Sequence, residues 1–192
     1  DMPLNYGSQI EEHKFVRNDA GMFDVSHMAA VNIKGERAKD FLRYLLANDV
    51  AKLKEPGKAL YTCMCNESGG IIDDLIVYFL APDFYRVVVN AGTRQKDLAW
   101  FREYAKEFNV EIIERTDLAI IAIQGPNARQ KVDSVLDQQH KMGVENLKPF
   151  QAIRSDDWLI ARTGYTGEDG YEIMLPAKEA SQFWQKLLSA GI

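Results

Sequence analysis

The sequence predicts an α+β fold made of two similar β-α-β-β-β-α halves with largely antiparallel sheets. Three observations predict it: short segments alternate between apolar and polar residues, helical stripes of apolar residues separate them, and the order of segments repeats. Turn-forming sequences join neighbouring strand segments, which is typical of antiparallel hairpins rather than of a doubly wound parallel sheet. With 192 residues, 46% of them hydrophobic, the chain can bury a sizeable core.

The first half is expected over about residues 28–107. Residues 28–34 alternate as a half-buried strand does, and residues 36–47 change to the apolar spacing of a helix. Three further strands and a closing helix follow, and a glycine-containing turn joins the first two of these strands. They are expected at 59–65, 71–80, 84–90 and about 93–108.

The second half, over about residues 118–190, repeats this order. An apolar strand at 118–123 precedes a helix at about 127–136, and Pro176 stands at the first position of a final helix over 177–189. The three strands between these helices are expected at 150–154, 158–163 and 171–175.

One fragment repeats at the level of single residues. Ile33-Lys34-Gly35-x-x-Ala38 matches Ile123-Gln124-Gly125-x-x-Ala128 at corresponding places of the two halves. In each copy the glycine lets the strand turn sharply, and the small alanine lets the next helix sit close. Because Gly-x-x-Ala after a strand is common in any α+β protein, the duplication also depends on the repeated order of elements.

Composition argues against several classes of protein. The net charge is −5 and no basic block occurs, which argues against nucleic acid as a partner. The longest apolar run, at 75–81, is far shorter than the ~20 residues of a membrane-spanning helix, so no membrane span is expected. Two cysteines cannot form a disulfide framework, which favours a reducing cytosol or organelle matrix.

No motif for a nucleotide or a metal ion is found in the sequence. The glycines between Gly164 and Gly170 connect two expected strands, which indicates a hairpin rather than a dinucleotide-binding turn. The three histidines lie far apart, so they lack the spacing of metal ligands. Cys63 and Cys65 have the wrong spacing for a zinc knuckle and are expected to be small buried residues.

The pair Asp73-Asp74 interrupts an otherwise apolar strand. Strand periodicity places Asp74 on the same face as Ile76 and Tyr78. A carboxylate on an apolar face needs a hydrogen-bonding partner or a chemical role, and desolvation there would raise its pKa and suit it to hold a proton. The alternatives are that this face is solvated, or that Asp74 caps a nearby backbone group.

Glu172 and two tyrosines are further candidates. Glu172 begins an expected strand beside an acidic turn, where a solvated strand-end charge is the ordinary explanation. Tyr61 and Tyr78 lie on strands joined by a hairpin and could flank one pocket, although aromatic residues are equally ordinary on antiparallel sheets.

Five strings occur in a characteristic order and spacing. They are Asp24-Val25-Ser26-His27-Met28, Asn66-Glu67-Ser68-Gly69-Gly70-Ile71-Ile72-Asp73-Asp74-Leu75, Val88-Val89-Asn90-Ala91, Gln124-Gly125-Pro126 and Gly164-Tyr165-Thr166-Gly167-Glu168-Asp169-Gly170-Tyr171-Glu172. Together they resemble the T-protein family of the glycine cleavage system, the tetrahydrofolate-dependent aminomethyltransferases. The resemblance covers nearly the whole chain.

The resemblance implies an enzyme of glycine catabolism. In this family the lipoyl arm of the partner H-protein carries an aminomethyl group. The transferase releases ammonia and passes the methylene carbon to tetrahydrofolate, giving 5,10-methylenetetrahydrofolate, and needs no metal. The implied compartment is the cytoplasm of a bacterium or, in a eukaryote, the mitochondrial matrix.

The resemblance also implies roles for particular residues. Asp74 matches the family's essential aspartate, which lies by N5 and N10 of the folate and assists proton movement. Glu172 matches the glutamate that holds the pterin ring by hydrogen bonds. Tyr61, Ile76 and Tyr78 match positions that line the folate pocket.

The chain departs from the family in length. T-proteins are roughly twice as long, and the parts not matched are the extreme N-terminal segment and everything after Ile192. The later part contains an arginine that contacts folate and ends in a β-barrel domain. Without it the folate site is incomplete, so we do not expect this chain alone to be active.

The alternative function is a non-catalytic or differently specialised folate-binding relative. The tRNA-modifying branch of the family carries a cysteine-containing signature in place of the Gly-Tyr-Thr-Gly string. Folate-dependent demethylating dehydrogenases share the fold but carry a flavin domain that this chain does not contain. The intact strings around Asp74 and Glu172 favour the aminomethyltransferase.

Overall fold

The computed structural model describes residues 4–192, and the chain forms two compact units. Ser26–Leu118 form one, which we call the central unit after its place in the sequence. The N-terminal segment up to Val25 and Ala119–Ile192 form the other, the flanking unit. Each unit has its own five-stranded sheet and its own hydrophobic core.

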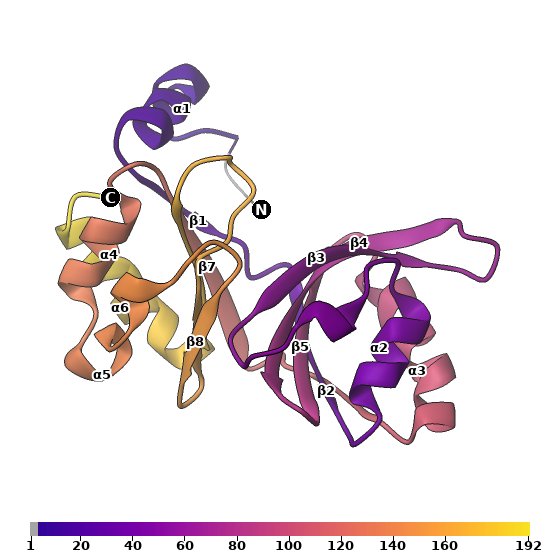
Figure 1. Ribbon diagram of the computed structural model, residues 1–192. Helices are drawn as coiled ribbons and strands as arrows, with labels where there is room; N and C mark the ends of the chain where they lie inside the picture. The colour runs from indigo at the N-terminus through magenta and orange to yellow at the C-terminus, as the bar shows by residue number, and fades with distance from the viewer. Residues whose placement is uncertain (1–3) are drawn as a thin grey trace. The chain divides into compact units, whose positions relative to one another are not determined.

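The central unit is a five-stranded sheet with helices on one face (Figure 1). The strand order is β3-β4-β5-β2-β6, and every neighbouring pair is antiparallel. Its elements are β2 (Ala29–Lys34), α2 (Ala38–Leu45), the 3₁₀ helix η1 (Val50–Lys52), β3 (Ala59–Cys65), β4 (Ile71–Ala81), β5 (Phe84–Val89), α3 (Arg94–Phe108) and β6 (Glu111–Glu114).

The core of the central unit fixes which face of β4 is free of helices. Phe41 of α2 and Phe101 of α3 are fully buried, with ring centroids 6.2 Å apart. Leu75 and Val77 of β4 pack in the same cluster. Because side chains alternate along the regular part of a strand, Asp74, Ile76 and Tyr78 point to the opposite face, which α2 and α3 do not cover.

The flanking unit repeats this architecture. Its strand order is β1-β7-β10-β9-β8, and β1 pairs antiparallel with β7 although about half of the chain separates them in sequence (Figure 1). Its elements are α1 (Gln9–Asn18), β1 (Gly21–Asp24), β7 (Leu118–Gln124), α4 (Ala128–Val135), α5 (Gln138–Lys141), the 3₁₀ helix η2 (Val144–Asn146), β8 (Ala152–Ser155), β9 (Trp158–Ala161), β10 (Gly170–Pro176) and α6 (Ala177–Ser189).

The predicted fold class is confirmed. Both β2-α2-β3-β4-β5-α3 and β7-α4-β8-β9-β10-α6 follow the β-α-β-β-β-α order. The two sheets also place corresponding strands in corresponding positions. The fifth strand of each sheet comes from a different end of its half. In the central unit it is β6, which follows the half in the sequence, and in the flanking unit it is β1, which precedes the half. Sequence periodicity missed both of these four-residue strands, and it missed α1.

The repeated glycine motif forms the same turn in both units. Gly35 has a φ of 142° and Gly125 a φ of 139°, a conformation that other residues rarely adopt. In each copy the amide of the alanine three residues on donates to the glycine carbonyl, at 3.0 Å for Ala38 and 3.1 Å for Ala128. Both alanines are fully buried, so the small side chain does let the helix sit close.

Element boundaries differ from the predictions at a few places. Pro176 ends β10 and occupies the N-cap position of α6 instead of the first helical position. The strand predicted to start at residue 150 begins at Ala152, because Phe150 has a left-handed φ of 58°. Within residues 4–192, no helix is both long and apolar enough to cross a membrane.

Candidate functional site

Four of the predicted site residues lie together on the helix-free face of the central sheet. In the β3–β4 register Tyr61 lies opposite Ile76, and Asp74 lies opposite Cys63. Tyr78 occupies the next position on the same face, and both it and Ile76 are buried. This face is therefore buried at Ile76 and Tyr78 and open to solvent at Tyr61.

A hydrogen bond joins the two polar members of this group. The hydroxyl of Tyr61 donates to Asp74 Oδ2 at 2.8 Å. This bond to a carboxylate, together with desolvation, raises the pKa of the Tyr61 hydroxyl. Tyr61 is 45% exposed and Asp74 is half-buried, so the pair remains accessible to a ligand.

The side-chain amide of Asn90 forms hydrogen bonds to Asp74. Its Nδ2 donates to the backbone oxygen of Asp74 at 2.9 Å and more weakly to Oδ1 of the same residue at 3.5 Å. The same amide donates to Asp73 Oδ1 at 3.1 Å. Sequence reasoning gave Asn90 no role, although an asparagine directly after the buried apolar strand β5 is the signal that could have found it.

Glu172 lies on β10 in the flanking unit. Its neighbours Tyr171 and Ile173 belong to the hydrophobic core, so Glu172 points to the opposite face of its sheet. It is only 6% exposed, and Thr163 Oγ1 donates to its Oε2 at 2.5 Å. Burial raises the pKa of Glu172, and the Thr163 bond partly offsets this rise. The explanation as a solvated strand-end charge is therefore wrong.

Gln124 forms hydrogen bonds to two residues of the hairpin before Glu172. Gln124 Nε2 donates to the carbonyl of Thr163 at 3.0 Å, and the hydroxyl of Thr166 donates to Gln124 Oε1 at 2.8 Å. Gly164 makes this close approach possible, since a Cβ there would lie 1.9 Å from Gln124 Oε1. The predicted hairpin between Gly164 and Gly170 is confirmed, and it holds the Thr163 hydroxyl in place beside Glu172.

The predicted residues are thus distributed over both units. Asp74, Tyr61, Ile76 and Tyr78 belong to the central unit, and Glu172 belongs to the flanking unit. Each group occupies the face of its sheet that the helices of its unit leave open. In the central unit a carboxylate and a tyrosine ring lie side by side, and in the flanking unit a buried carboxylate can accept hydrogen bonds from neighbouring N–H donors.

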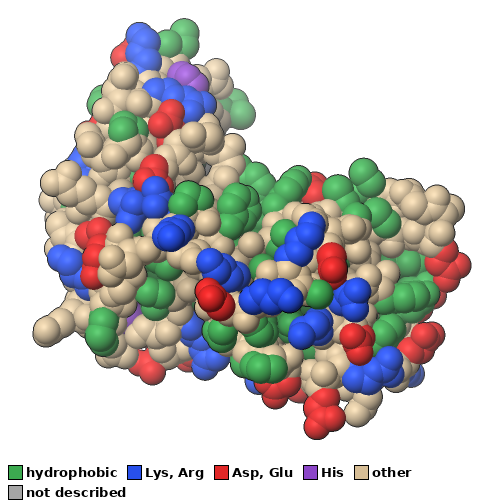
Figure 2. All heavy atoms as spheres, viewed as in Figure 1, with side chains coloured by type: hydrophobic (Ala, Val, Ile, Leu, Met, Phe, Trp, Pro, Cys, Tyr) green, Lys and Arg blue, Asp and Glu red, His purple; other side chains and the backbone are tan. Residues whose placement is uncertain are grey.

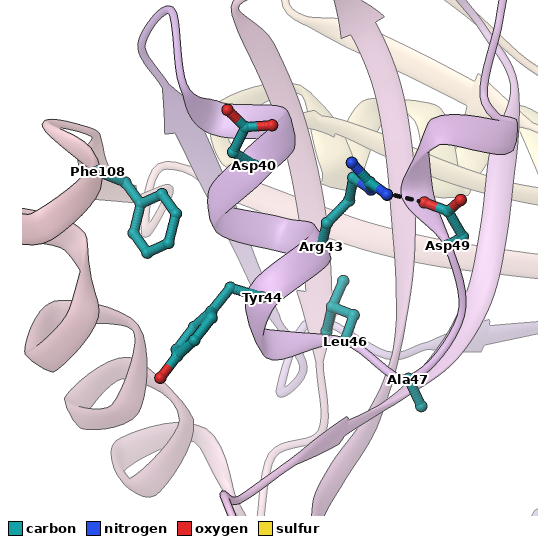
Figure 3. Close-up of a pocket in the computed structure, with 7 residues that line it drawn as sticks. All are labelled: Asp40, Arg43, Tyr44, Leu46, Ala47, Asp49 and Phe108. Carbon is teal, nitrogen blue, oxygen red and sulfur yellow. Dashed lines mark hydrogen bonds and ion pairs between the residues drawn. The ribbon is translucent and has the colours of Figure 1, made fainter.

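A surface hollow of about 500 Å³ lies on the helix side of the central unit (Figure 3). It contains none of the predicted site residues. Arg43 and Asp49 on its wall form an ion pair at 2.9 Å, so these two charges are already compensated. The lining residues are Asp40, Arg43, Tyr44, Leu46, Ala47, Asp49 and Phe108.

Within residues 4–192, no group of three or more His, Cys, Asp and Glu side chains could hold a metal ion. Cys63 and Cys65 are free thiols, and they are half-buried rather than buried as the sequence predicts. Cys63 lies opposite Asp74 on β3, beside the part of the helix-free face where Tyr61 is exposed, and Cys65 lies opposite Ile71. Figure 2 shows acidic and basic side chains interspersed over the face in view.

The family of the chain follows from its sequence. All of residues 1–192 match the family model described as the GCVT N-terminal domain. The chain belongs to this family. Its structure also resembles that of the glycine cleavage system aminomethyltransferase T from Bartonella henselae, with a TM-score of 0.85 and 38% identity. That match covers 93% of this chain and 48% of the other, so the chain spans about half the length of that protein.

A more distant structural relative shares the GCVT N-terminal fold. A chain of the heterotetrameric sarcosine oxidase from Corynebacterium sp. U-96 matches with a TM-score of 0.63 over 94% of this chain and 89% of its own length. The two sequences are only 13% identical, so this likeness shows the fold alone.

Proposed function

We propose that this chain is the folate-binding part of an aminomethyltransferase of the glycine cleavage system. The reaction takes an aminomethyl group from the lipoyl arm of the H-protein, releases ammonia and gives 5,10-methylenetetrahydrofolate. Membership of the GCVT N-terminal domain family and 38% identity to the Bartonella aminomethyltransferase support this proposal. Because the chain spans about half of that relative, we propose this activity for the longer protein that contains it.

The observation that carries the proposal is the bonded pair Tyr61–Asp74 beside buried Ile76 and Tyr78. A tyrosine ring can cover the flat face of a pterin, and buried apolar neighbours keep water from a reactive carbon. We assign to Asp74 the passage of protons. When the methylene carbon joins the two folate nitrogens, the two protons that they lose end on ammonia and on the lipoyl sulfur. A carboxylate next to these atoms can accept and return them.

We assign the binding of the pterin ring to Glu172. A pterin presents neighbouring N–H donors, which the two oxygens of one carboxylate can accept together. Glu172 suits this role because Thr163 orients its carboxylate and because burial strengthens hydrogen bonds formed there. Tetrahydrofolate is then a co-substrate, the lipoylated H-protein is the protein partner, and no metal takes part. We further propose a reducing compartment, bacterial cytoplasm or mitochondrial matrix, which suits two free cysteines.

The proposal is tested by Asp74→Asn in the full-length protein. We expect loss of methylene transfer from aminomethyl-loaded H-protein to tetrahydrofolate, with an unchanged circular dichroism spectrum and unfolding midpoint. Asp40→Asn, an exposed carboxylate on the helix side, is the matched control and should retain activity. Near wild-type turnover by Asp74→Asn would contradict the proposed mechanism.

The alternative, a folate-binding relative without transferase activity, makes a different prediction. Calorimetry with tetrahydrofolate would then show binding that weakens in Glu172→Gln, while the full-length wild type transfers no methylene group. Transfer activity in the wild type excludes this alternative.

A further inference from the structure

A second pair of carboxyl groups lies on the opposite side of strand β4 from the site. Asp73 points toward α3 and is 7% exposed, and Asp97 in the first turn of α3 is completely buried. The function proposed above uses neither residue. Buried carboxyl groups are uncommon unless they are paired or have a role, so this pair requires a physical account.

The surroundings of Asp73 and Asp97 differ sharply. Asp73 accepts hydrogen bonds from the backbone amide of Asn90 at 3.2 Å and from its side-chain amide at 3.1 Å. Within residues 4–192, neither oxygen of Asp97 has a hydrogen-bond partner of good geometry. Each oxygen of Asp73 therefore accepts a hydrogen bond from Asn90, whereas neither oxygen of Asp97 has such a donor among the residues that the structure describes.

The charged and polar groups around Asp97 come from two elements. Thr93 and Lys96 belong to the start of α3, and Asp73 comes from β4. The ammonium of Lys96 donates to the backbone oxygen of Ile72 at 2.6 Å and forms no ion pair with Asp97. An ionised Asp97 would thus be a buried charge beside a second negative charge, with no cation bonded to it.

Two neighbouring buried carboxyl groups avoid this cost when one of them keeps a proton. Burial, together with the neighbouring Asp73, raises the pKa of Asp97 to about 7 against the lowering influence of Thr93 and Lys96. Burial acts on Asp73 too, but donors from Asn90 and Thr93 outweigh it and leave the pKa of Asp73 below its ordinary value. The proton therefore resides on Asp97, which can donate it in a hydrogen bond to Asp73.

We propose that Asp97 is a positioning residue for Asp74: it keeps a proton shared with Asp73, and this hydrogen bond keeps Asp73 in place to hold Asn90 against Asp74. Asn90 is the connecting group, because one side-chain amide bonds both Asp73 and Asp74. When Asp97 ionises, its repulsion of Asp73 loosens the amide of Asn90 and with it the carboxylate of Asp74. The shared proton is independent of the proposed function, whereas the effect on catalysis rests on it.

The shared proton is tested directly on the wild-type chain. A carboxyl ¹³C NMR titration should show Asp97 titrating near neutral pH and Asp73 below the ordinary range for aspartate. Titration of Asp97 near its ordinary value of 3.8 would overturn the proposal. The signal is assigned by its loss in Asp97→Asn, and if that variant does not fold, selective labelling and the through-space contact with Thr93 assign it.

The same proton links the stability of the fold to pH. Between pH 3.8 and about 7 the folded state binds a proton at Asp97 that the unfolded state has released. The ratio of folded to unfolded protein should therefore fall up to about tenfold per pH unit as the pH rises through this window. Asp97→Asn, whose amide imitates a neutral carboxylic acid, should remove this slope and equal or exceed the wild type at pH 8. Asp97→Ala, which leaves Asp73 without its donor, should be less stable than Asp97→Asn at every pH.

The positioning role is tested in the full-length protein. We expect kcat of the wild type to fall above pH 7, and Asp97→Asn to retain kcat to a higher pH with an unchanged KM for tetrahydrofolate. Glu103→Gln, an exposed acid on the same helix, is the matched control and should follow the wild-type profile. Identical pH profiles of Asp97→Asn and wild type would overturn the positioning role. Absence of transfer in every protein, with Asp97 titrating near pH 7, would instead refute the proposed function and leave the shared proton intact.

Discussion

The hydroxyl of Tyr61 and the carboxylate of Asp74 form a 2.8 Å hydrogen bond that runs diagonally across the β3–β4 hairpin. The two residues are not opposite each other, since Tyr61 faces Ile76 and Asp74 faces Cys63. Diagonal neighbours on one face of an antiparallel pair are within reach when one side chain is long, as tyrosine is. The bond orients the carboxylate of Asp74 through Oδ2, while Asn90 contacts Oδ1 and the backbone oxygen of the same residue.

Removing this bond should change the chemistry without changing the fold. Because Tyr61 is 45% exposed and Phe keeps its ring, we expect Tyr61→Phe to leave the unfolding midpoint unchanged. We expect methylene transfer by the full-length protein to fall about tenfold, the effect of one hydrogen bond to a charged group. Steady-state kinetics checks this, and unchanged kcat and KM would show that Tyr61 does not orient Asp74.

The ionisation of Tyr61 provides an independent measurement. The hydrogen bond to Asp74 raises the pKa of the tyrosine, so Asp74→Asn should lower it toward the ordinary value of 10.0. Spectrophotometric titration, with Tyr61→Phe identifying the signal, measures the shift. A Tyr61 pKa that is the same with and without the Asp74 carboxylate would contradict the bond.

Thr163 should stabilise the buried carboxylate of Glu172. Thr163→Val keeps the shape of the side chain but removes the donated hydrogen bond, so we expect a loss of about 1–3 kcal/mol in the free energy of unfolding at pH 7. Urea denaturation measures it. Thr116→Val, outside the strands and helices of the structure, is the control and should have little effect.

Ionisation of Glu172 should lower the free energy of unfolding as the pH rises. Burial raises its folded-state pKa above the ordinary 4.5, so between these two values the folded protein binds a proton that the unfolded chain does not. Stability is highest below this window and falls as the pH rises through it. Glu172→Gln should lack this part of the slope, and parallel curves for the variant and the wild type would contradict the raised pKa.

Gly125 should tolerate no side chain. A Cβ there would lie 2.3 Å from the backbone oxygen of Asp19, and its φ of 139° is unfavourable for other residues. We expect Gly125→Ala to cost about 3 kcal/mol or more, measured by urea denaturation. Gly92→Ala is the control, because its Cβ would meet no atom within 4 Å and should cost less than about 0.5 kcal/mol.

The hollow on the helix side should be dispensable for transfer. Arg43 and Asp49 form an exposed ion pair there, and such pairs contribute little. We expect Arg43→Ala to leave both the unfolding midpoint and the transfer rate of the full-length protein unchanged. A large loss of activity without unfolding would assign the hollow a role in the reaction.

Strand alternation and the glycine motif were sufficient to predict much of the fold. Alternation along β4 placed Asp74 with Ile76 and Tyr78, because the period of a strand is fixed by backbone geometry. The glycine motif located the same turn in both halves, because only glycine adopts its φ without strain. The short strands β1 and β6 were missed, since four residues give too little pattern and their pairing partners are chosen by the sheet.

The sequence by itself determined the repeated β-α-β-β-β-α order, the family and the face on which Asp74 lies. Only the tertiary structure decided what surrounds each carboxyl group. It showed that Glu172 is buried against Thr163 and that Asp97, an ordinary helix residue in the sequence, meets Asp73 behind the site. The reason is physical: burial and hydrogen-bond supply set the protonation of a carboxyl group, and both come from residues distant in the chain.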